Sequence, residues 1–199
     1  MNIVVAGGTG FIGQALCAAL LHGGHRVSLL TRHTGQVLHR PDAHVNVVEW
    51  NARDTGPWEE LLEGADAVIN LAGAPIADAR WTDERKRLLT ESRVLTTRLL
   101  VRALSRRSSK PPVFISASGI GYYGASDDRQ LDEGAVRGTG FLADLCLAWE
   151  AEAMSAAEFG TRVVLLRTGM VLEADGGALG KMLLPFRLFA GGPIMPGTQ

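Results

Sequence analysis

The sequence predicts an α/β fold in which a doubly wound parallel sheet carries helices on both faces. Three observations predict this class: short runs rich in branched aliphatic residues, longer segments in which apolar residues recur at helical spacing, and a regular alternation of the two along the chain. Such alternation is typical of βαβ units, whose parallel strands lie buried between helices. At 199 residues, 46% of them hydrophobic, the chain is large enough to build such a core.

Strands and helices are expected in alternating order. The expected strands occupy residues 2–6, 26–30, 45–49, 65–71, 113–117 and 162–166. The first helix opens after a glycine-rich turn and stops at Gly23-Gly24, and a short helix covers residues 58–63. Further helices are expected over residues 140–159 and 179–190.

The longest expected helix begins at Thr82, whose hydroxyl can cap it. Asp83 and Glu84 follow in its first turn, where the helix dipole favours acidic groups. Its buried face is expected to consist mostly of leucines, namely Leu88, Leu89, Leu95, Leu99, Leu100 and Leu104. Basic residues gather where this helix ends, which favours interaction with the helix dipole over a nucleic-acid patch.

The composition argues against several classes of function. With a net charge of −1 the chain has no electrostatic preference for nucleic acid or an anionic membrane. No stretch approaches the roughly 20 apolar residues of a membrane span. Cys17 and Cys146 both lie in apolar helical patterns, so we expect buried, reduced thiols and a cytoplasmic protein. The five histidines show no ligand spacing, and no metal site is expected.

The segment GGTGFIG places Gly7, Gly10 and Gly13 directly after the first strand and at the start of the first helix. Glycines here allow a tight turn, close approach of a phosphate to the backbone, and close packing of helix on strand. The free N–H groups and partial positive charge of a helix N-terminus suit an anion. The turn therefore predicts a dinucleotide-binding site; the alternative is a strand–helix turn that binds nothing.

The end of the second strand indicates which dinucleotide binds. An acidic residue at this place would hydrogen-bond the ribose 2′-hydroxyl and favour NAD. The chain has Thr31-Arg32 instead, and a guanidinium pairs with a 2′-phosphate and stacks on adenine. We therefore expect NADP as the cofactor; the alternative is a solvated loop arginine.

Four segments together resemble the extended short-chain dehydrogenase/reductases: GGTGFIG at 7–13, VINLAG at 68–73, FISASGIGYYG at 114–124 and VVLLRTGMVL at 163–172. Within that superfamily the chain is similar to the NAD(P)-dependent epimerase/dehydratase family. Its YfcH-like epimerase-family branch is indicated by RW at 80–81, ESRVLTT at 91–97, AWEAEA at 148–153 and LLPFRLFAGGPI at 183–194. The resemblance covers essentially the whole chain. It implies a Rossmann-type fold with NADP along the carboxyl ends of the strands.

The resemblance also implies a set of cofactor-binding residues. They are Gly7, Gly10, Phe11, Ile12 and Gly13 at the pyrophosphate, Thr31 and Arg32 at the adenosine ribose, Leu71, Ala72 and Gly73 at the second ribose, and Val171 near the nicotinamide. Arg93 falls where the superfamily usually has an active-site asparagine, so it is expected to reach a phosphate or to hold substrate. The alternative is a surface arginine, because helix spacing alone does not decide its face.

The family's catalytic tyrosine is missing from its usual place. The resemblance implies a tyrosine with a lysine four residues later, whose charge favours the phenolate. The corresponding region reads GTGFLADLCLAWEAEA, with Phe141 or Leu142 at the tyrosine position and no lysine. Ordinary epimerase chemistry is therefore not expected from this helix.

Ser118 and Tyr123 are the candidate catalytic residues that remain. Ser118 matches the family's serine or threonine after the fifth strand, with Ser116 as the alternative. Tyr123 matches a tyrosine that is not the family's proton donor. Tyr122, Asp144 or a bound water could supply the acid instead. A further alternative is a hydride transfer that needs no such acid.

Residues 1–176 are expected to form the dinucleotide-binding domain, and residues 177–199 to begin a substrate-covering segment. The family's chains continue further, so the resemblance implies that the C-terminal substrate subdomain is largely absent from this sequence. A homodimer is one arrangement that would cover the surface left bare.

Two functions are consistent with these observations. One is an NADP-dependent oxidoreductase or epimerase-like enzyme acting on a small hydroxyl- or carbonyl-bearing substrate, such as a nucleotide sugar. The other is an NADP-binding regulator or scaffold without turnover.

Overall fold

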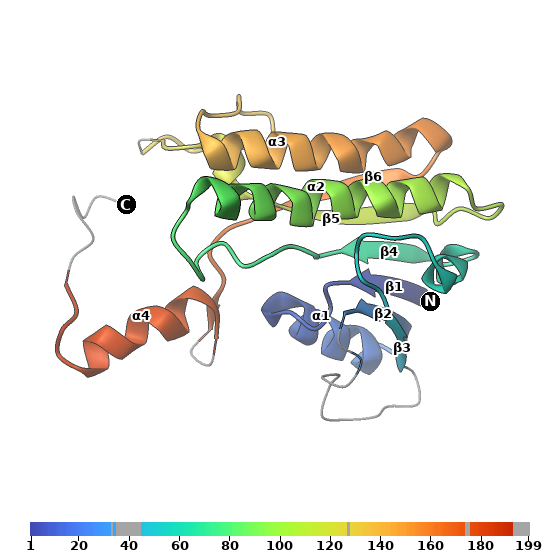
Figure 1. Cartoon of the computed structure of the whole chain (residues 1–199), viewed down its shortest axis with the longest axis horizontal. Helices are drawn as coiled ribbons and strands as arrows, with labels where there is room; N and C mark the ends of the chain where they lie inside the picture. The colour runs from blue at the N-terminus through green and yellow to red at the C-terminus, as the bar shows by residue number, and fades with distance from the viewer. Residues whose placement is uncertain (33, 35–44, 127, 174–175, 193–199) are drawn as a thin grey trace. The chain divides into compact units, whose positions relative to one another are not determined.

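Parallel strands form the sheet of the computed structural model, which describes residues 1–32, 34, 45–126, 128–173 and 176–192 (Figure 1). The strands are β1 (Asn2–Ala6), β2 (Arg26–Thr31), β3 (Val45–Glu49), β4 (Ala67–Asn70), β5 (Val113–Gly119) and β6 (Arg162–Thr168). The α-helices between them are α1 (Phe11–His22), α2 (Asp83–Ser105) and α3 (Phe141–Met154). Short 3-10 helices are η2 (Pro57–Leu62), η3 (Ile120–Tyr123) and η4 (Ser155–Phe159). Each expected strand is present, and β5 and β6 continue beyond their expected ends.

The strands lie in the order β3-β2-β1-β4-β5-β6, and every neighbouring pair is parallel. The chain therefore begins with β1 in the middle of the sheet and adds β2 and β3 on one side of it. It then crosses to the other side of β1, where β4, β5 and β6 follow in order. This doubly wound order confirms the predicted fold class. The order reverses between β1 and β4, and ligands of such sheets bind at the carboxyl ends of the strands at this point.

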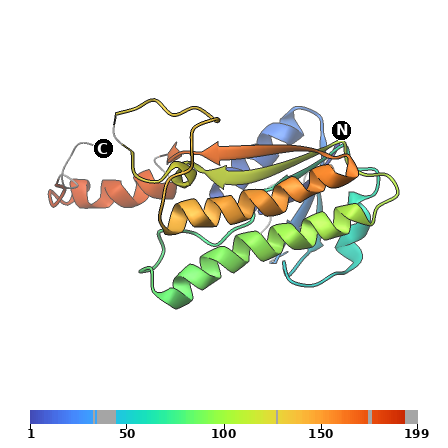
Figure 2. The ribbon, with the colours of Figure 1, turned by 90° about the horizontal axis from the view of Figure 1, so that it is seen from above.

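Different helices bury the two faces of the sheet (Figure 1). Val4 and Ala6 of β1 belong to the core shared with α2 and α3, whereas Ile3 and Val5 belong to the core shared with α1. This alternation follows from the two-residue period of a strand. Figure 2 shows α2 and α3 running side by side over one face of the sheet. Both cysteines are free and buried, as predicted.

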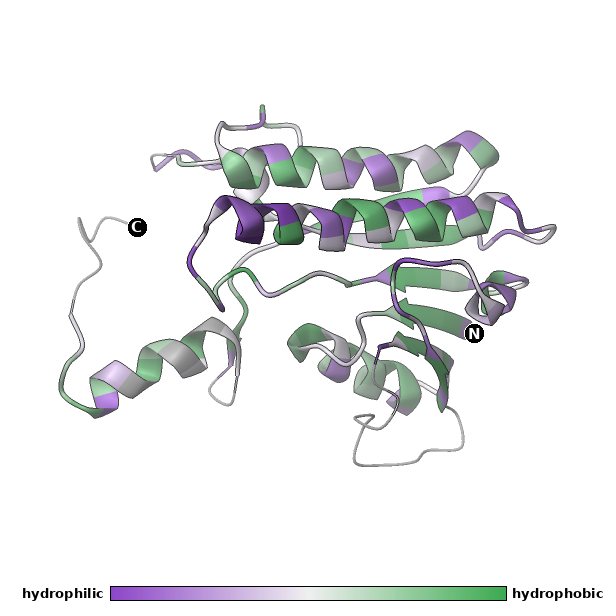
Figure 3. Ribbon diagram, in the orientation of Figure 1, coloured by the Kyte–Doolittle hydropathy of each residue, from purple (hydrophilic) through white to green (hydrophobic). Residues whose placement is uncertain are grey.

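The buried face of α2 differs from the expected row of leucines. Leu89 and Leu100 are fully buried, but Leu88 and Leu95 are 42% and 48% exposed. Leu88 lies about 100° from Leu89 around the helix axis, and on this helix that rotation turns its side chain toward solvent. Polar residues, Arg93 among them, complete the buried face instead. Figure 3 shows the same contrast: the strands are mostly hydrophobic, whereas α2 carries both kinds of residue.

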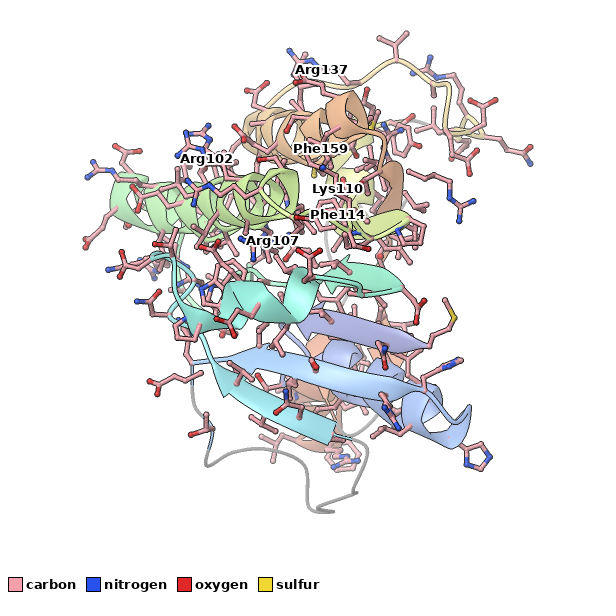
Figure 4. The ribbon with its side chains drawn as sticks, turned by 90° about the vertical axis from the view of Figure 1, so that its right-hand side faces the viewer. Arg102, Arg107, Lys110, Phe114, Arg137 and Phe159 are labelled. Atoms are coloured by element: carbon pink, nitrogen blue, oxygen red, sulfur yellow. The ribbon has the colours of Figure 1, made fainter. Side chains whose placement is uncertain are left out.

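The basic residues at the end of α2 take part in packing. Figure 4 shows Arg102, Arg107 and Lys110 around this end of the helix. The Arg107 Nε donates to the carbonyl oxygen of Ala103 at 3.3 Å, and its Nη2 lies 3.5 Å from Oε2 of Glu59 in η2. These contacts give a carbonyl oxygen in the last turn of α2 a hydrogen-bond donor and join η2 to the helix end. They support a structural role for the basic residues over a nucleic-acid patch.

The chain divides into two compact units, Met1–Thr168 and Gly169–Gln199. The described part of the second unit contains β7 (Leu172–Glu173), which bridges antiparallel to Gly176 and Gly177, and α4 (Gly177–Arg187). Compactness alone does not define a domain, so the domain boundary at residue 176 stays a prediction. Among the described residues, no helix has the length and apolar character that crossing a bilayer requires.

Candidate functional site

The glycine turn and the end of β4 meet where the strand order reverses. Gly7 follows β1 with a φ of +80°, a conformation that side chains rarely adopt. A Cβ at Gly7 would lie 2.7 Å from both the carbonyl carbon of Leu71 and the amide nitrogen of Ala72. Two segments predicted to bind the cofactor are thus in backbone contact, and this contact requires glycine at position 7.

Gly10 and Gly13 have different environments. A Cβ at Gly13 would lie 2.5 Å from the Cα of Gly8 and would also clash with the carbonyl oxygen of Gly7. At Gly10, the carbonyl oxygen of Gly7 is the one described atom within 4 Å of such a Cβ, at 3.2 Å. Gly13 therefore lets α1 pack on the turn, whereas Gly10 is exposed and leaves the backbone open to a ligand.

The N-terminus of α1 is open to an anion. Gly10 is its N-cap residue, no side chain in the described part of the chain caps the helix, and its first turn contains no acidic residue. Phe11 and Ile12, predicted to line the pyrophosphate, are 40% and 44% exposed. Uncapped N–H groups need an acceptor, and the positive end of the helix dipole favours a phosphate. This end of α1 can therefore bind a negative group through its backbone.

The ends of β2 and β3 are joined beside the turn. The amide nitrogen of Trp50 donates to the carbonyl oxygen of Thr31 at 2.8 Å. Trp50 is 3% exposed and packs on Trp58, with ring centroids 5.4 Å apart, so it belongs to the core. Thr31 is buried and Arg32 is exposed. Arg32 therefore presents its charge to solvent at this edge.

Arg93 is buried, which excludes the surface position that helix spacing left open. Its residue surface is 7% exposed. Nη2 donates to the carbonyl oxygen of Ala74 at 2.9 Å, and Nη1 to that of Leu89 at 3.1 Å. A Cβ at Gly73 would lie 3.0 Å from Cζ of Arg93, so glycine leaves room for the guanidinium. Burial lowers the pKa of Arg93. Arg93 holds the loop after β4, and its contact with a phosphate or substrate stays a prediction.

A second polar network supports the same loop. The buried Asn70, at the end of β4, accepts from the N–H of Ala72 at 3.1 Å and donates to Oγ1 of Thr97 at 2.8 Å. Oγ1 of Thr97 also accepts from Nε1 of Trp149 at 2.9 Å, which joins α2 to α3. These groups satisfy one another and fix the backbone after β4. Asn70 and Thr97 lie in the motifs VINLAG and ESRVLTT, but their roles were not predicted.

Two serines of β5 face the helices that cover the sheet. Ser116 and Ser118 are both buried and lie on one face of the strand, as its two-residue period predicts. Ser118 Oγ donates to Oε1 of Glu150 at 2.5 Å. Ser116 Oγ reaches the carbonyl oxygen of Ala117 at 3.3 Å. Ser118 is thus the serine that contacts an ionisable side chain.

Arg167, near the end of β6, joins several segments. Its Nε and Nη2 donate to Oε1 and Oε2 of Glu150 at 2.8 and 2.9 Å. Its Nη1 donates to the Tyr123 hydroxyl at 3.0 Å and to the carbonyl oxygen of Glu133 at 3.1 Å. Its Cζ lies 3.5 Å from the ring centroid of Tyr122, a cation–π contact. One partly buried ion pair therefore links β6, α3, η3 and the loop before α3.

Glu150 and Arg167 form a charged pair. Burial raises the pKa of Glu150, but hydrogen bonds from Arg167 and Ser118 and the charge of Arg167 outweigh this, so the pKa lies below its ordinary value. The hydrogen bond to Glu150 raises the pKa of Arg167. Neither residue was predicted as functional, although Glu150 lies in the motif AWEAEA and Arg167 in VVLLRTGMVL. A single sequence does not reveal that a helix glutamate and a strand arginine meet.

The start of α3 holds an aromatic contact where the family's catalytic tyrosine would lie. Phe141 meets Trp81 edge-on, with ring centroids 5.6 Å apart. Four residues after Phe141 or Leu142 the chain has Leu145 and Cys146, both buried. Neither supplies a cation, so α3 offers no tyrosine–lysine pair.

Two further expectations concern other parts of the chain. Val171 lies in the second unit and is 38% exposed, and its place near the nicotinamide stays a prediction. Within the described residues, no cluster of three or more histidine, cysteine or acidic side chains could hold a metal ion.

Comparison with known proteins gives consistent matches along the whole chain. A profile of the NAD dependent epimerase/dehydratase family matches residues 3–173. The "Epimerase family protein SDR39U1 homolog, chloroplastic" of Arabidopsis thaliana is 37% identical over 204 residues, which span 100% of this chain and 57% of the relative. The "Epimerase family protein ML0860" of Mycobacterium leprae is 38% identical over 198 residues, which span 99% of this chain and 61% of the relative.

A solved structure has the same fold. The crystal structure of human epimerase family protein SDR39U1 (isoform 2) with NADPH superposes with a TM-score of 0.79 at 36% identity, over 100% of this chain and 64% of that chain. The chain thus spans about three fifths of the length of these relatives, which are 57% to 64% covered.

Proposed function

The chain belongs to the NAD dependent epimerase/dehydratase family, and from this membership we propose that it binds NADP(H) at the glycine turn and serves an oxidoreductase or epimerase-like enzyme. The proposed substrate is a small molecule with a hydroxyl or carbonyl group, nucleotide sugars being one class. When bound, the cofactor supplies or accepts a hydride. The observation that carries the proposal is the backbone contact of Gly7 with the end of β4 beside the uncapped start of α1.

The residues present fit a dinucleotide. The exposed Gly10 leaves space above the turn, and among the described residues no side chain is hydrogen-bonded to the N–H groups that a pyrophosphate would use. Asn70 and Arg93 hold the loop after β4 in place, so the backbone of residues 71–73 is fixed where the second ribose is proposed to lie.

NADP is proposed over NAD because of Arg32. Its exposed guanidinium follows β2 directly, where a 2′-phosphate of the adenosine ribose would lie in such a fold. The presence of NADPH in the crystal structure of the human relative supports this choice. Thr31, buried beside it, is proposed to shape the ribose site.

Rapid-mixing measurements of nicotinamide absorbance test the enzymatic proposal. The chain is mixed with NADPH or NADP and a panel of nucleotide sugars, small aldehydes, ketones and alcohols. We expect at least one compound to change the absorbance at a rate proportional to protein concentration. Binding of NADPH without any such change would contradict hydride transfer by this chain.

An NADP-binding regulator is the second candidate, and the absence of a tyrosine–lysine pair on α3 favours it. Such a protein would respond to the cofactor without consuming it. Its signature would be protection of the glycine turn from hydrogen exchange on NADPH binding, with the nicotinamide absorbance constant for every compound of the panel.

The proposed oligomer is a homodimer. Leu88 and Leu95 on α2, and Leu147 and Met154 on α3, are exposed apolar residues spaced seven apart, as in helix–helix interfaces. Light scattering during size exclusion should give twice the chain mass, and Leu95→Lys should reduce it to one. A monomer in both proteins would contradict the proposal.

A cytoplasmic location also stays a proposal, since one relative is named chloroplastic.

A further inference from the structure

Arg167 uses most of its guanidinium donors within the described part of the chain. Arginine has five N–H donors and no acceptor. Nε and one Nη2 proton are directed to Glu150, and Nη1 serves both the Tyr123 hydroxyl and the carbonyl oxygen of Glu133. Because arginine cannot accept, the hydroxyl of Tyr123 is the acceptor in their hydrogen bond. Arg167 therefore fixes the oxygen of Tyr123 without using its proton.

The two candidate catalytic residues consequently present opposite groups. The Tyr123 hydroxyl makes no other hydrogen bond to the described residues, and Tyr123 is half-buried rather than enclosed. Its proton is available to an external acceptor. Ser118 is 7% exposed, and its own proton is directed to Glu150. Of the two, Tyr123 is the residue with a proton to give.

We propose that Tyr123 is the proton donor of this site, and that Arg167 and Glu150 are positioning residues that act through it; this rests on the proposed function. In carbonyl reduction, the substrate carbon receives the hydride with its electron pair, and the carbon–oxygen π bond opens. The substrate oxygen takes the proton from Oη of Tyr123, which leaves an alcohol and a phenolate. Water returns a proton to Oη, and alcohol oxidation follows the reverse path.

The surroundings of Arg167 suit this role. A cation hydrogen-bonded to Oη stabilises the negative charge that appears there as the proton leaves. Arg167 would thus supply the positive charge that a lysine supplies in the family. Its paired bonds to Glu150 fix the guanidinium plane, and Ser118 in turn fixes Glu150. The Tyr122 ring closes the other side of Arg167.

The arrangement can be tested without substrate or cofactor, because the chain has just two tyrosines. Tyrosine labelled with ¹³C at Cζ gives two NMR resonances, which Tyr122→Phe and Tyr123→Phe assign. We expect Arg167→Gln to shift the Tyr123 resonance, since this carbon responds to hydrogen bonds at the attached oxygen. The control Arg98→Gln removes the ion pair of Arg98 with Glu152, between α2 and α3, and should leave the resonance in place.

An unshifted Tyr123 resonance in Arg167→Gln would overturn the assigned hydrogen bond. If that variant does not fold, Arg167→Met, which removes the N–H donors but keeps the aliphatic part of the side chain, provides the same comparison. A resonance that moves equally in Arg98→Gln would attribute the shift to general loosening, and would also count against the assignment.

Kinetics with a compound found in the absorbance panel test the function. Tyr123→Phe should lower kcat about 10²–10⁴-fold, the usual contribution of a general acid, with unchanged affinity for NADPH. Arg167→Gln should lower kcat with little change in KM, and Arg167→Lys should restore part of it. Full activity of Tyr123→Phe would overturn this inference alone. NADPH binding without wild-type turnover would overturn the proposed function, and the role of Tyr123 with it.

Discussion

Alanine at Gly10 and alanine at Gly13 should affect different properties of the protein. At Gly13 the added Cβ would lie 2.5 Å from backbone Cα of Gly8, so α1 has to move away from the turn. Overpacking of this kind costs about 1–3 kcal/mol. At Gly10 the neighbouring oxygen is 3.2 Å away, and a shift of a few tenths of an ångström accommodates the methyl group.

These costs convert into melting temperatures. For a chain of this size, 1 kcal/mol corresponds to about 2–4 °C, so a cost of about 1–3 kcal/mol in Gly13→Ala should lower Tm by about 2–12 °C. Alanine for glycine at an N-cap costs under about 1 kcal/mol, so Gly10→Ala should lower Tm by at most about 4 °C. The Gly10 methyl would instead stand where the pyrophosphate is proposed to approach the backbone. NADPH binding should weaken at least about tenfold, which is about 1.4 kcal/mol.

Circular dichroism melts without cofactor and calorimetric titration with NADPH separate the two effects. Gly10→Ala should melt near the wild type and bind NADPH weakly, while Gly13→Ala should melt early. Unchanged NADPH affinity in Gly10→Ala would refute the placement of the pyrophosphate. An unchanged Tm in Gly13→Ala would refute the close packing of α1 on the turn.

Three other variants or treatments test further parts of the account. Arg32→Ala should weaken NADP binding about tenfold or more while changing NAD little, which calorimetry with both cofactors measures; equal losses would contradict the 2′-phosphate contact. Glu150→Gln should lower the free energy of unfolding by about 3 kcal/mol in urea titrations, because it leaves Arg167 unpaired, whereas Glu152→Gln on the exposed side should cost under about 1 kcal/mol. The folded pKa of Glu150 is lowered, so its contribution to stability is present above the ordinary value of 4.5 and is lost as pH falls from there through the lower folded value; the free energy of unfolding of Glu150→Gln should therefore approach that of the wild type at acidic pH. Burial raises the pKa of Cys17 to about 11, so mass spectrometry should find it unalkylated by iodoacetamide at pH 8 in the native chain and alkylated after unfolding; rapid native labelling would contradict its burial.

The sequence predicts the sheet well because its signals are local. Runs of branched aliphatic residues separated by helical patterns are explained by strands buried on both sides, and the order of the sheet follows from short right-handed connections. The N-cap at Thr82 is confirmed, since its hydroxyl accepts from the N–H of Arg85 at 3.2 Å. The buried face of α2 was predicted less well. Leu88 and Leu95 were expected to be buried, but both are exposed to solvent.

The polar contacts of the site depend on positions far apart in the chain. Ser118 could be selected from its place after a strand, but its partner Glu150 lies 32 residues later. Arg167 and Tyr123 are separated by 44 residues. Nothing in the local pattern distinguishes Arg93, which is buried, from the exposed basic residues of the same helix. Such pairings emerge only when the sheet brings its carboxyl ends together.

Binding of nicotinamide cofactors to the purified chain tests the central claim most directly. Titration with NADPH, followed by the fluorescence of its nicotinamide ring, should show saturable binding that is tighter than for NADH and that Gly10→Ala weakens. Absence of saturable binding, or equal binding by wild type and Gly10→Ala, would contradict the proposal that the glycine turn holds the cofactor.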